Sequence, residues 1–386
     1  MNTKRLVILT TAILLGLVLI PLRLRMLATP PMTSGFGLKV RAAGPWYVAS
    51  SGDDGNDCLS QVSPCATING ALNKPGFMAD DTVLVATGIY TGTGTEVVLL
   101  DKSVALSGGW EPGFTAQTGT SIIDGEEARR GIIVNAGVTA TVNRFTVQNG
   151  YTDDGNGGGI YNSGTLTLTN CTINDNFAYY DGYFGHGGGG IYNVDALTLI
   201  NSTVTNNTST DGGGGIYGTS GSSTVIMDSQ IFANTSINWE GGGVQVDQAS
   251  ELSISRSWVV GNAALGNDAG GIGSNNGGSA YIENSIIAGN TAGQTGGGVW
   301  LSGGGLYHIV NSHIVGNQSN GEGAGSANIL EDHVNQVISD DEFNAERDLS
   351  KDFRVRSKEE LLYYRKFKRF FGDKVPLVEI GRTQHV

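Results

Sequence analysis

Apolar and polar residues alternate with a period of two in short segments between residues 157 and 317. These segments recur in six units whose starting points are 25 to 31 residues apart. The alternating inward pairs are Leu166/Leu168, Leu197/Leu199, Thr224/Ile226, Leu252/Ile254, Ala280/Ile282 and Tyr307/Ile309. A period of two is the spacing of a strand with one buried face, so each unit is predicted to contain a strand rather than a helix.

Each unit also carries three further marks at fixed places. A branched residue follows a glycine run at Ile160, Ile191, Ile216, Val244, Ile272 and Val299. A second short strand is marked by Ile173, Val204, Ile231, Val259, Ile287 and Ile314. Strands this short cannot bury a face alone, so neighbouring units must stack into one continuous core. We therefore predict an all-β fold, a single-stranded right-handed parallel β-helix in which each unit is one coil that rises about 4.8 Å.

An asparagine closes every unit, six residues after the turn that separates the two strands. These residues are Asn176, Asn207, Asn234, Asn262, Asn290 and Asn317. Asn tolerates positive φ in a turn, and its amide can bond the equivalent amide one coil away. The sequence therefore predicts a buried asparagine ladder, and it predicts that the glycine runs form a second bend where backbones approach closely.

The combination of a Gly157–Ile160 run with a closing segment such as Asn284–Asn290 resembles known repeats. It is similar to the repeats of polymorphic outer-membrane proteins and, more broadly, to bacterial β-helix proteins with a pectin-lyase-like fold. The resemblance covers roughly residues 46 to 328 and implies about ten coils, of which the six between residues 157 and 317 are regular. That fold carries lyases, hydrolases, adhesins and inert stalks, so it does not define a function.

The N-terminal part of the solenoid resembles the cap of exported bacterial proteins of this kind. In them such a stretch, here residues 46–80, is a first strand, a disulfide loop and a short helix over the open end. Cys58 and Cys65 lie seven residues apart, and in an exported chain they are expected to pair, with two free thiols as the alternative. Cys171 occupies a place that holds Ser in the other units, so we expect a small buried side chain there.

Residues 1–43 indicate export. Lys4 and Arg5 precede an apolar run from Leu6 to Ile20, which Pro21 ends. This arrangement is typical of a secretory signal, and an uncleaved anchor stays open as the alternative, although the run is shorter than the roughly 20 residues of a bilayer span. The protein is expected to be secreted or attached to the cell surface, with residues 44–330 forming the β-helix.

Residues 331–386 form a charged tail of different composition. A capping box at Ser357–Glu360 predicts a short helix from Leu361 to Phe371. Three interpretations remain open: a helix that covers the C-terminal end of the solenoid, a solvated tail, or a basic helix that contacts a membrane surface or a partner.

The body of the chain is strongly acidic. Residues 44 to 340 contain 27 Asp and Glu against six Lys and Arg. Such a charge repels nucleic acid and argues against polyanionic glycans as ligands. No cofactor is required by any motif, but calcium is possible at Asp53, Asp54 and Asp57, with solvated loops as the alternative because the spacing of known calcium loops is absent.

The candidates for catalysis are Asp153, Asp154 and His186. They resemble the acidic pair and the Gly-His-Gly of polygalacturonases, in which one carboxyl group protonates the leaving oxygen and another activates water. The other elements of that family are absent, so no activity is assigned. The insertion at residues 179–186 is the largest break in the repeat, so any catalytic site is expected beside it.

The residue after each branched position is expected to point outward. These residues are Tyr161, Tyr192, Tyr217, Gln245, Gly273 and Trp300. Three successive tyrosines would form a flat ledge suited to a sugar chain or a partner protein, whereas simple stacking that stabilises the face is the alternative.

Together these features predict an exported, monomeric β-helix that serves as a cell-surface, adhesin-like structural or binding module. Its partners would be glycans or cell-surface proteins, and not nucleic acid. A membrane would be contacted only through residues 1–25 or the C-terminal helix. A polysaccharide lyase or a polygalacturonase-like hydrolase on the same fold is the alternative.

Overall fold

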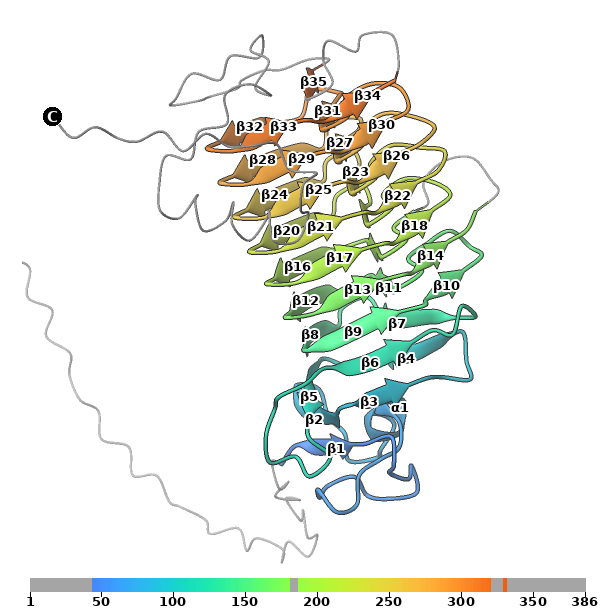
Figure 1. Ribbon diagram of the computed structural model, residues 1–386. Helices are drawn as coiled ribbons and strands as arrows, with labels where there is room; N and C mark the ends of the chain where they lie inside the picture. Colours follow the sequence, from blue (N-terminus) through green and yellow to red (C-terminus); the bar gives the residue numbers. More distant parts are fainter. Residues whose placement is uncertain (1–43, 181–186, 321–328, 332–386) are drawn as a thin grey trace, which may run out of the picture. The chain divides into compact units, whose positions relative to one another are not determined.

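The computed structural model describes residues 44–180 and 187–320 and the backbone of residues 329–331. They form a parallel β-helix in which four sheets run along the solenoid, as the successive coils in Figure 1 show. Neighbouring strands within each sheet are parallel and come from successive coils. The fold class predicted from the alternating pattern is therefore confirmed.

Sheets A and B carry the two strands that the alternation predicted. Sheet A consists of β1 (Trp46–Val48), β2 (Asp81–Ala86), β5 (Val104–Trp110), β8 (Thr139–Asn143), β12 (Thr165–Thr169), β16 (Ala196–Ile200), β20 (Ser223–Met227), β24 (Glu251–Ser255), β28 (Ser279–Glu283) and β32 (Tyr307–Val310). Sheet B consists of β3 (Gly88–Tyr90), β6 (Ser121–Asp124), β9 (Phe145–Gln148), β13 (Thr172–Asn174), β17 (Thr203–Thr205), β21 (Gln230–Phe232), β25 (Trp258–Val260), β29 (Ile286–Ala288) and β33 (His313–Val315).

Sheets C and D complete each coil. Sheet C consists of β4 (Glu96–Leu100), β7 (Arg130–Val134), β11 (Ile160–Asn162), β15 (Ile191–Asn193), β19 (Ile216–Gly218), β23 (Val244–Val246), β27 (Ile272–Ser274), β31 (Val299–Leu301) and β35 (Ile329–Glu331). Sheet D consists of β10 (Tyr151–Thr152), β14 (Phe177–Ala178), β18 (Thr208–Ser209), β22 (Thr235–Ser236), β26 (Ala263–Ala264), β30 (Thr291–Ala292) and β34 (Gln318–Ser319). Within the described ranges seven coils have a strand in sheet D, so complete turns there are somewhat fewer than the ten coils expected.

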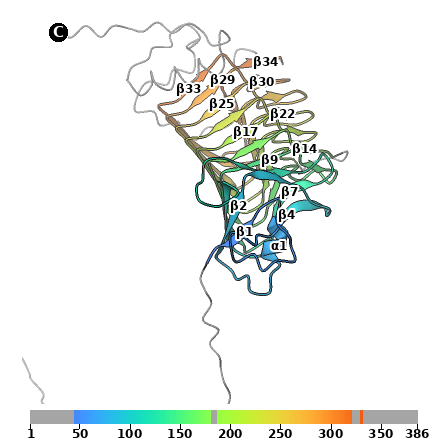
Figure 2. The ribbon, with the colours of Figure 1, turned by 60° about the horizontal axis from the view of Figure 1, so that its bottom comes forward.

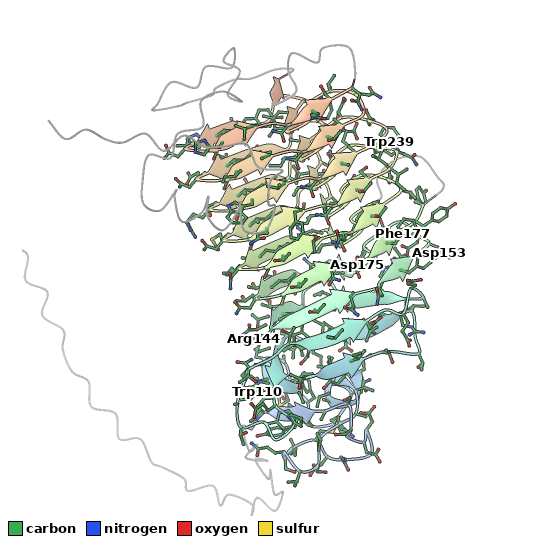
Figure 3. The ribbon with its side chains drawn as sticks, viewed as in Figure 1. Trp110, Arg144, Asp153, Asp175, Phe177 and Trp239 are labelled. Carbon is green, nitrogen blue, oxygen red and sulfur yellow. A yellow bond between two sulfur atoms is a disulfide. The ribbon has the colours of Figure 1, made fainter. Side chains whose placement is uncertain are left out.

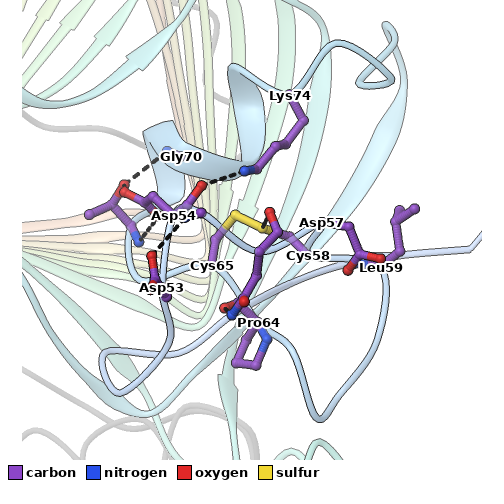
Figure 4. The surroundings of a disulfide bond; sticks show 12 residues. Asp53, Asp54, Asp57, Cys58, Leu59, Pro64, Cys65, Gly70 and Lys74 are labelled. Atoms are coloured by element: carbon purple, nitrogen blue, oxygen red, sulfur yellow. Dashed lines mark hydrogen bonds between the residues drawn. A yellow bond between two sulfur atoms is a disulfide. The ribbon is translucent and has the colours of Figure 1, made fainter.

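A short helix lies at the N-terminal end of the solenoid. Helix α1 (Ile68–Leu72) packs against β1 and β4 (Figure 2). The disulfide predicted between Cys58 and Cys65 is present, with 5.1 Å between the two Cα atoms (Figure 4). The side chain of Thr67 accepts a hydrogen bond from Gly70 N at 2.8 Å, which caps the helix. The loop and the helix are thereby tied to the first strand.

The core is the column of inward side chains that the alternation predicted. Three consecutive strands, β11, β12 and β13, contribute to it from three different sheets. Their inward side chains have no measurable exposure: Ile160, Leu166, Leu168 and Ile173. Cys171 belongs to the same core at 3% exposure, in line with the small buried side chain expected there. Burial raises the pKa of its thiol to about 11, so the group stays protonated at neutral pH.

The asparagine ladder is present through all six regular coils. Asn176 Nδ2 donates to Asn207 Oδ1 at 2.8 Å, and the same bond recurs at 2.9 to 3.0 Å up to Asn317. Each Nδ2 also donates to a carbonyl of the preceding coil, as Asn262 does to Ile231 O at 3.0 Å. The ladder is thus buried, and from Asn176 to Asn290 each side-chain NH2 group donates both to the next asparagine and to a backbone carbonyl.

The positive φ expected at the ladder asparagines lies one residue earlier. The residues with φ near +60° are Asp175, Asn206, Ala233, Gly261, Gly289 and Gly316. The ladder amide must point into the solenoid, so the residue before it makes the sharp turn. The expectation that the ladder residue itself takes this conformation is wrong.

The glycine runs lie where the backbones of successive coils touch. A Cβ added to Gly215 would lie 2.6 Å from Gly243 O in the next coil and 3.0 Å from the amide of Asn234. No side chain fits in that space, so the close approach predicted for this bend is confirmed. Within the described residues, no helix is long and apolar enough to cross a membrane.

Candidate functional site

The outer face of sheet C carries one side chain per coil in exact register. Tyr161 pairs with Tyr192, Tyr192 with Tyr217, and Tyr217 with Gln245. The residues before them, such as Ile216, are fully buried in the core. A three-residue strand with alternating directions therefore places the tyrosines in one row along the outside of the sheet.

The tyrosine rings stack on each other rather than forming an open ledge. The ring centroids of Tyr161 and Tyr192 are 5.6 Å apart at 12°, and those of Tyr192 and Tyr217 are 5.4 Å apart at 1°. Tyr192 is only 8% exposed and Tyr217 only 5%. Because ring faces are occupied by neighbouring rings, the expectation of an exposed flat surface is wrong for these two residues. A binding role for the row stays a prediction.

An arginine closes the N-terminal end of the tyrosine row. The guanidinium of Arg130 lies 5.8 Å from the centroid of the Tyr161 ring. It also forms an ion pair with Asp154 and donates to Asn156 O at 2.9 Å. Burial raises the pKa of Asp154, but the hydrogen bond and charge of Arg130 outweigh it and hold that pKa below its usual value. Arg130 therefore favours the ionised form of Asp154, and a catalytic role for this residue stays a prediction.

Carboxyl groups gather around Tyr217, the last of the three tyrosines. The Tyr217 hydroxyl donates to Asp247 Oδ2 at 2.5 Å. Glu240 lies four residues before the branched position of its coil and Asp268 four residues before that of the next, so the two occupy equivalent places. Asp211 is 5% exposed. We refer to Asp211, Tyr217, Glu240, Asp247 and Asp268 as the carboxylate cluster.

Gln245 continues the row and lies within the carboxylate cluster. Its side chain hydrogen-bonds Asp247, and its amide oxygen is buried without a hydrogen-bond partner. The next residue of the row is Gly273, and a Cβ there would lie 1.9 Å from that oxygen. Gly273 thus leaves room for the side chain of Gln245.

Burial and mutual repulsion shift the pKa values within the carboxylate cluster. Burial, and then the charges of Asp268, Asp247 and Asp211, raise the pKa of Glu240 to about 7. Burial also raises the pKa of Asp247, against the hydrogen bonds from Tyr217 and Gln245. The cluster therefore holds a carboxyl group that gains and loses its proton near neutral pH.

The remaining predicted residues lie apart from this cluster. Asp153 is exposed at the rim beside β10 (Figure 3), and His186 lies outside the described residues. Trp300 is half-buried and pairs with Gly273 on the neighbouring strand of sheet C. The structure thus brings Asp154, but not Asp153, to the end of the tyrosine row.

The three carboxylates proposed for calcium do not converge. Asp54 accepts from Thr67 N and Oγ1 at 2.9 and 2.7 Å (Figure 4). Asp53 and Asp57 accept from the backbone of Gly55 and Leu59. Among the residues that the structure describes, no group of three His, Cys, Asp or Glu side chains is arranged to hold a metal ion. Asp53 and Asp57 thus accept hydrogen bonds within the disulfide loop, and Asp54 holds Thr67, the residue that caps α1.

Two features of sheet C and its bends were not predicted from the sequence. A second, shorter ladder joins Asn162 Nδ2 to Asn193 Oδ1 at 2.8 Å, and its signal was the repeated Ile-Tyr-Asn. Glu240 and Asp268 were also overlooked. They stand where the two preceding coils have Gly187 and Gly212, and this interruption of the glycine run was the available signal.

The regular coils match a known protein family. Residues 130–319 match the family described as the right-handed β-helix region, which agrees with the handedness predicted from the repeat. The protein is thus a right-handed parallel β-helix. A comparison with curated proteins found no match.

Three solved structures are similar to this chain at low sequence identity. A pectate lyase, Pel9A, is 14% identical, with a TM-score of 0.47, over 76% of this chain and 78% of its own. A rhamnogalacturonan lyase is 12% identical, with a TM-score of 0.34, over 70% of this chain and 86% of its own. A GH136 lacto-N-biosidase from Eubacterium ramulus is 8% identical, with a TM-score of 0.27, over 77% and 68%. These similarities concern the fold alone.

Proposed function

We propose that the protein is an exported, adhesin-like β-helix module that binds a glycan through the outer face of sheet C. The observation that carries the proposal is the carboxylate cluster around Tyr217. Glu240 and Asp268 replace the first glycine of the run that the two preceding coils carry, and they leave acidic groups half-buried. Half-buried acidic groups of one sign cost stability, and such exceptions to a repeat occur at functional sites.

The charge of the cluster defines the class of ligand. Carboxylates accept hydrogen bonds from hydroxyl and ammonium groups, and these bonds are stronger than those between neutral groups. Sugar hydroxyls and amino-sugar ammonium groups fit this requirement, while the uronates of an anionic glycan would be repelled. The ligand is therefore a neutral or amine-bearing glycan.

Calorimetric titration of the purified protein tests this proposal. The ligands are chitosan oligosaccharides, neutral chitin oligosaccharides and oligogalacturonates of equal length. We expect binding to the first two and a loss of at least tenfold in affinity for Asp247→Asn. Glu251→Gln, an exposed change on sheet A, is the matched control and should bind as the wild type does. Binding of oligogalacturonate alone, or affinity that survives Asp247→Asn, would refute the proposal.

A second candidate function is glycan cleavage, which the raised pKa of Glu240 favours. A carboxyl group with a pKa of about 7 can donate a proton to a leaving oxygen near neutral pH. Asp268, at the equivalent place in the next coil, would supply the second carboxylate that hydrolysis needs. Release of reducing ends that Glu240→Gln abolishes would establish an enzyme. Binding with no release of reducing ends would leave the binding module.

Export is part of the proposal and is supported by the disulfide. A bond between Cys58 and Cys65 persists in an oxidising compartment and is rare in a reducing one. Fractionation of producing cells should recover the protein outside the cytoplasm, and thiol labelling without reductant should modify neither cysteine. A cytoplasmic protein with two labelled thiols in the cap would contradict export.

A further inference from the structure

The outer face of sheet B changes character along the solenoid. Its outward positions are polar on β9, β13 and β17, where Thr146, Gln148, Thr172 and Thr203 stand. In the last four coils they hold an apolar group. This apolar patch consists of Phe232, Trp258, Val260, Ile286, Ala288 and Val315.

Three of these outward residues are nevertheless buried, and the other three are partly buried. Trp258 is 6% exposed and Val260 5%, although Val259 between them is the residue that points into the core. Two side-chain oxygens on the same outer face, Asn174 Oδ1 and Thr205 Oγ1, are also buried and have no hydrogen-bond partner. Side chains that point away from the core lose their exposure when neighbouring side chains, as in the tyrosine row, or a further layer cover them.

We propose that residues 357–371 of this same chain, which are the capping box and the helix predicted from the sequence, dock on the apolar patch of sheet B. The described chain ends with β35 on the last coil, and residues 332–386 follow it. About 25 residues separate β35 from the helix, a length comparable with one whole coil, so the helix can reach any face of the last coils.

The composition of the helix complements the patch. One side carries Tyr363, Tyr364, Phe367, Phe370 and Phe371, which would bury the aromatic rings against Trp258 and its neighbours. The same helix carries Arg365, Lys366, Lys368 and Arg369. Exposed acidic groups flank the patch: Glu283 lies at the turn that leads into β29, and Asp228, which is already paired with Arg256, lies at the turn that leads into β21. The aromatic side chains of the tail thus meet the apolar patch, and its basic side chains lie near acidic groups.

This docking differs from an end cap. A helix over the C-terminal end would cover the edges of β32 to β35, whereas the patch extends backwards across four coils of sheet B to β21 (Figure 1). The docked tail would therefore join coils that otherwise contact only their neighbours.

Limited trypsin digestion and hydrogen exchange of the purified full chain test the proposal. In the wild type, cleavage at residues 365–369 and exchange across 357–371 should be slow. Trp258→Ser should speed both at least tenfold. Thr203→Gln, an outward change in the same row of sheet B, is the matched control and should leave both unchanged.

A second variant avoids any effect on folding of the solenoid. Phe367→Ser combined with Phe370→Ser changes only the tail, and should release it as fully as Trp258→Ser does. Fast cleavage in the wild type, or protection that survives both variants, would overturn the proposal. Protection that appears only at high protein concentration would show that the tail of a second copy docks instead. Protection that requires anionic vesicles would show that a membrane is the partner, and either result would overturn docking within one chain.

Discussion

The hydroxyl of Tyr217 donates to the carboxylate of Asp247, which lies one coil further along the solenoid, at 2.5 Å. This bond connects the aromatic row of sheet C to the carboxylate cluster. Removing the hydroxyl by Tyr217→Phe leaves a half-buried charge with one donor fewer, so we expect a loss of about 1.5 to 3 kcal/mol in the free energy of unfolding. Chemical denaturation measures it. Tyr161→Phe, at the half-buried start of the row, should change it by less than about 0.5 kcal/mol, and equal losses would contradict the role of this bond.

The asparagine ladder should be costly to interrupt. Asn262→Ala removes the donor to Asn290 and the acceptor of Asn234 within a buried column, so we expect a loss of about 1 to 3 kcal/mol. The exposed Gln248→Ala serves as the control and should stay within roughly 0.5 kcal/mol. A ladder variant as stable as this control would mean that the amides contribute no net stability.

Stability should fall as the pH rises from about 5 to 7. Glu240 has a folded pKa of about 7 against an ordinary value of 4.5, so the folded state holds a proton that the unfolded state has released in this window. The contribution of this proton to the free energy of unfolding is complete below pH 4.5. It is lost as the pH rises past 7, at about 1 kcal/mol per pH unit. Urea denaturation between pH 4.5 and 8 should show this slope, and Glu240→Gln should flatten it. Glu251→Gln should leave the slope unchanged, and a slope that Glu240→Gln retains would contradict the assignment.

Relief of backbone strain should stabilise the protein at Ala233. This exposed residue has a φ of 55° where the next three coils have glycine. Ala233→Gly is expected to add about 0.5 to 1 kcal/mol, because an L-residue pays for the left-handed conformation. Ala128→Gly, also exposed but without positive φ, should lose about 0.5 kcal/mol. Thermal unfolding that moves both variants in the same direction would refute this explanation.

The disulfide should stabilise the N-terminal cap. By the chain-entropy estimate, closing a loop of this length restricts the unfolded chain by about 2 to 3 kcal/mol. Cys58→Ser with Cys65→Ser should lower stability by that amount, and reductant should lower the wild type to the same value. If reductant destabilises the double variant equally, the effect belongs to another part of the molecule.

The sequence predicted the register of this fold because each coil repeats the same inward residues. Ile160, Ile191 and Ile216 occupy the same position in three successive coils. Stacking these side chains on each other sets which residues of neighbouring strands pair. The candidate site was harder to predict. Tyr217, Glu240 and Asp247 do not form a motif, and they meet only because one turn of the solenoid brings neighbouring coils together.

The burial of the tyrosine row was also beyond the sequence pattern. Alternation shows on which side of a strand Tyr192 lies, but it does not show what covers that side. The glycine-rich bends fold close to the rings, and Gly157 lies so near Tyr192 that an added Cβ would be 3.0 Å from the tyrosine Cβ. Tertiary contacts of this kind have no period in the chain.

The direction of the hydrogen bonds in the asparagine ladder has an electrical consequence. Every side-chain carbonyl from Asn207 to Asn317 accepts from the coil before it, and Asn176 accepts from Gly150 N. Six amide dipoles therefore point the same way and polarise one another inside a medium of low dielectric constant. The column has a negative end at the early coils and a positive end at the late ones, so a charge buried beside its first amide is in a different potential from one beside its last.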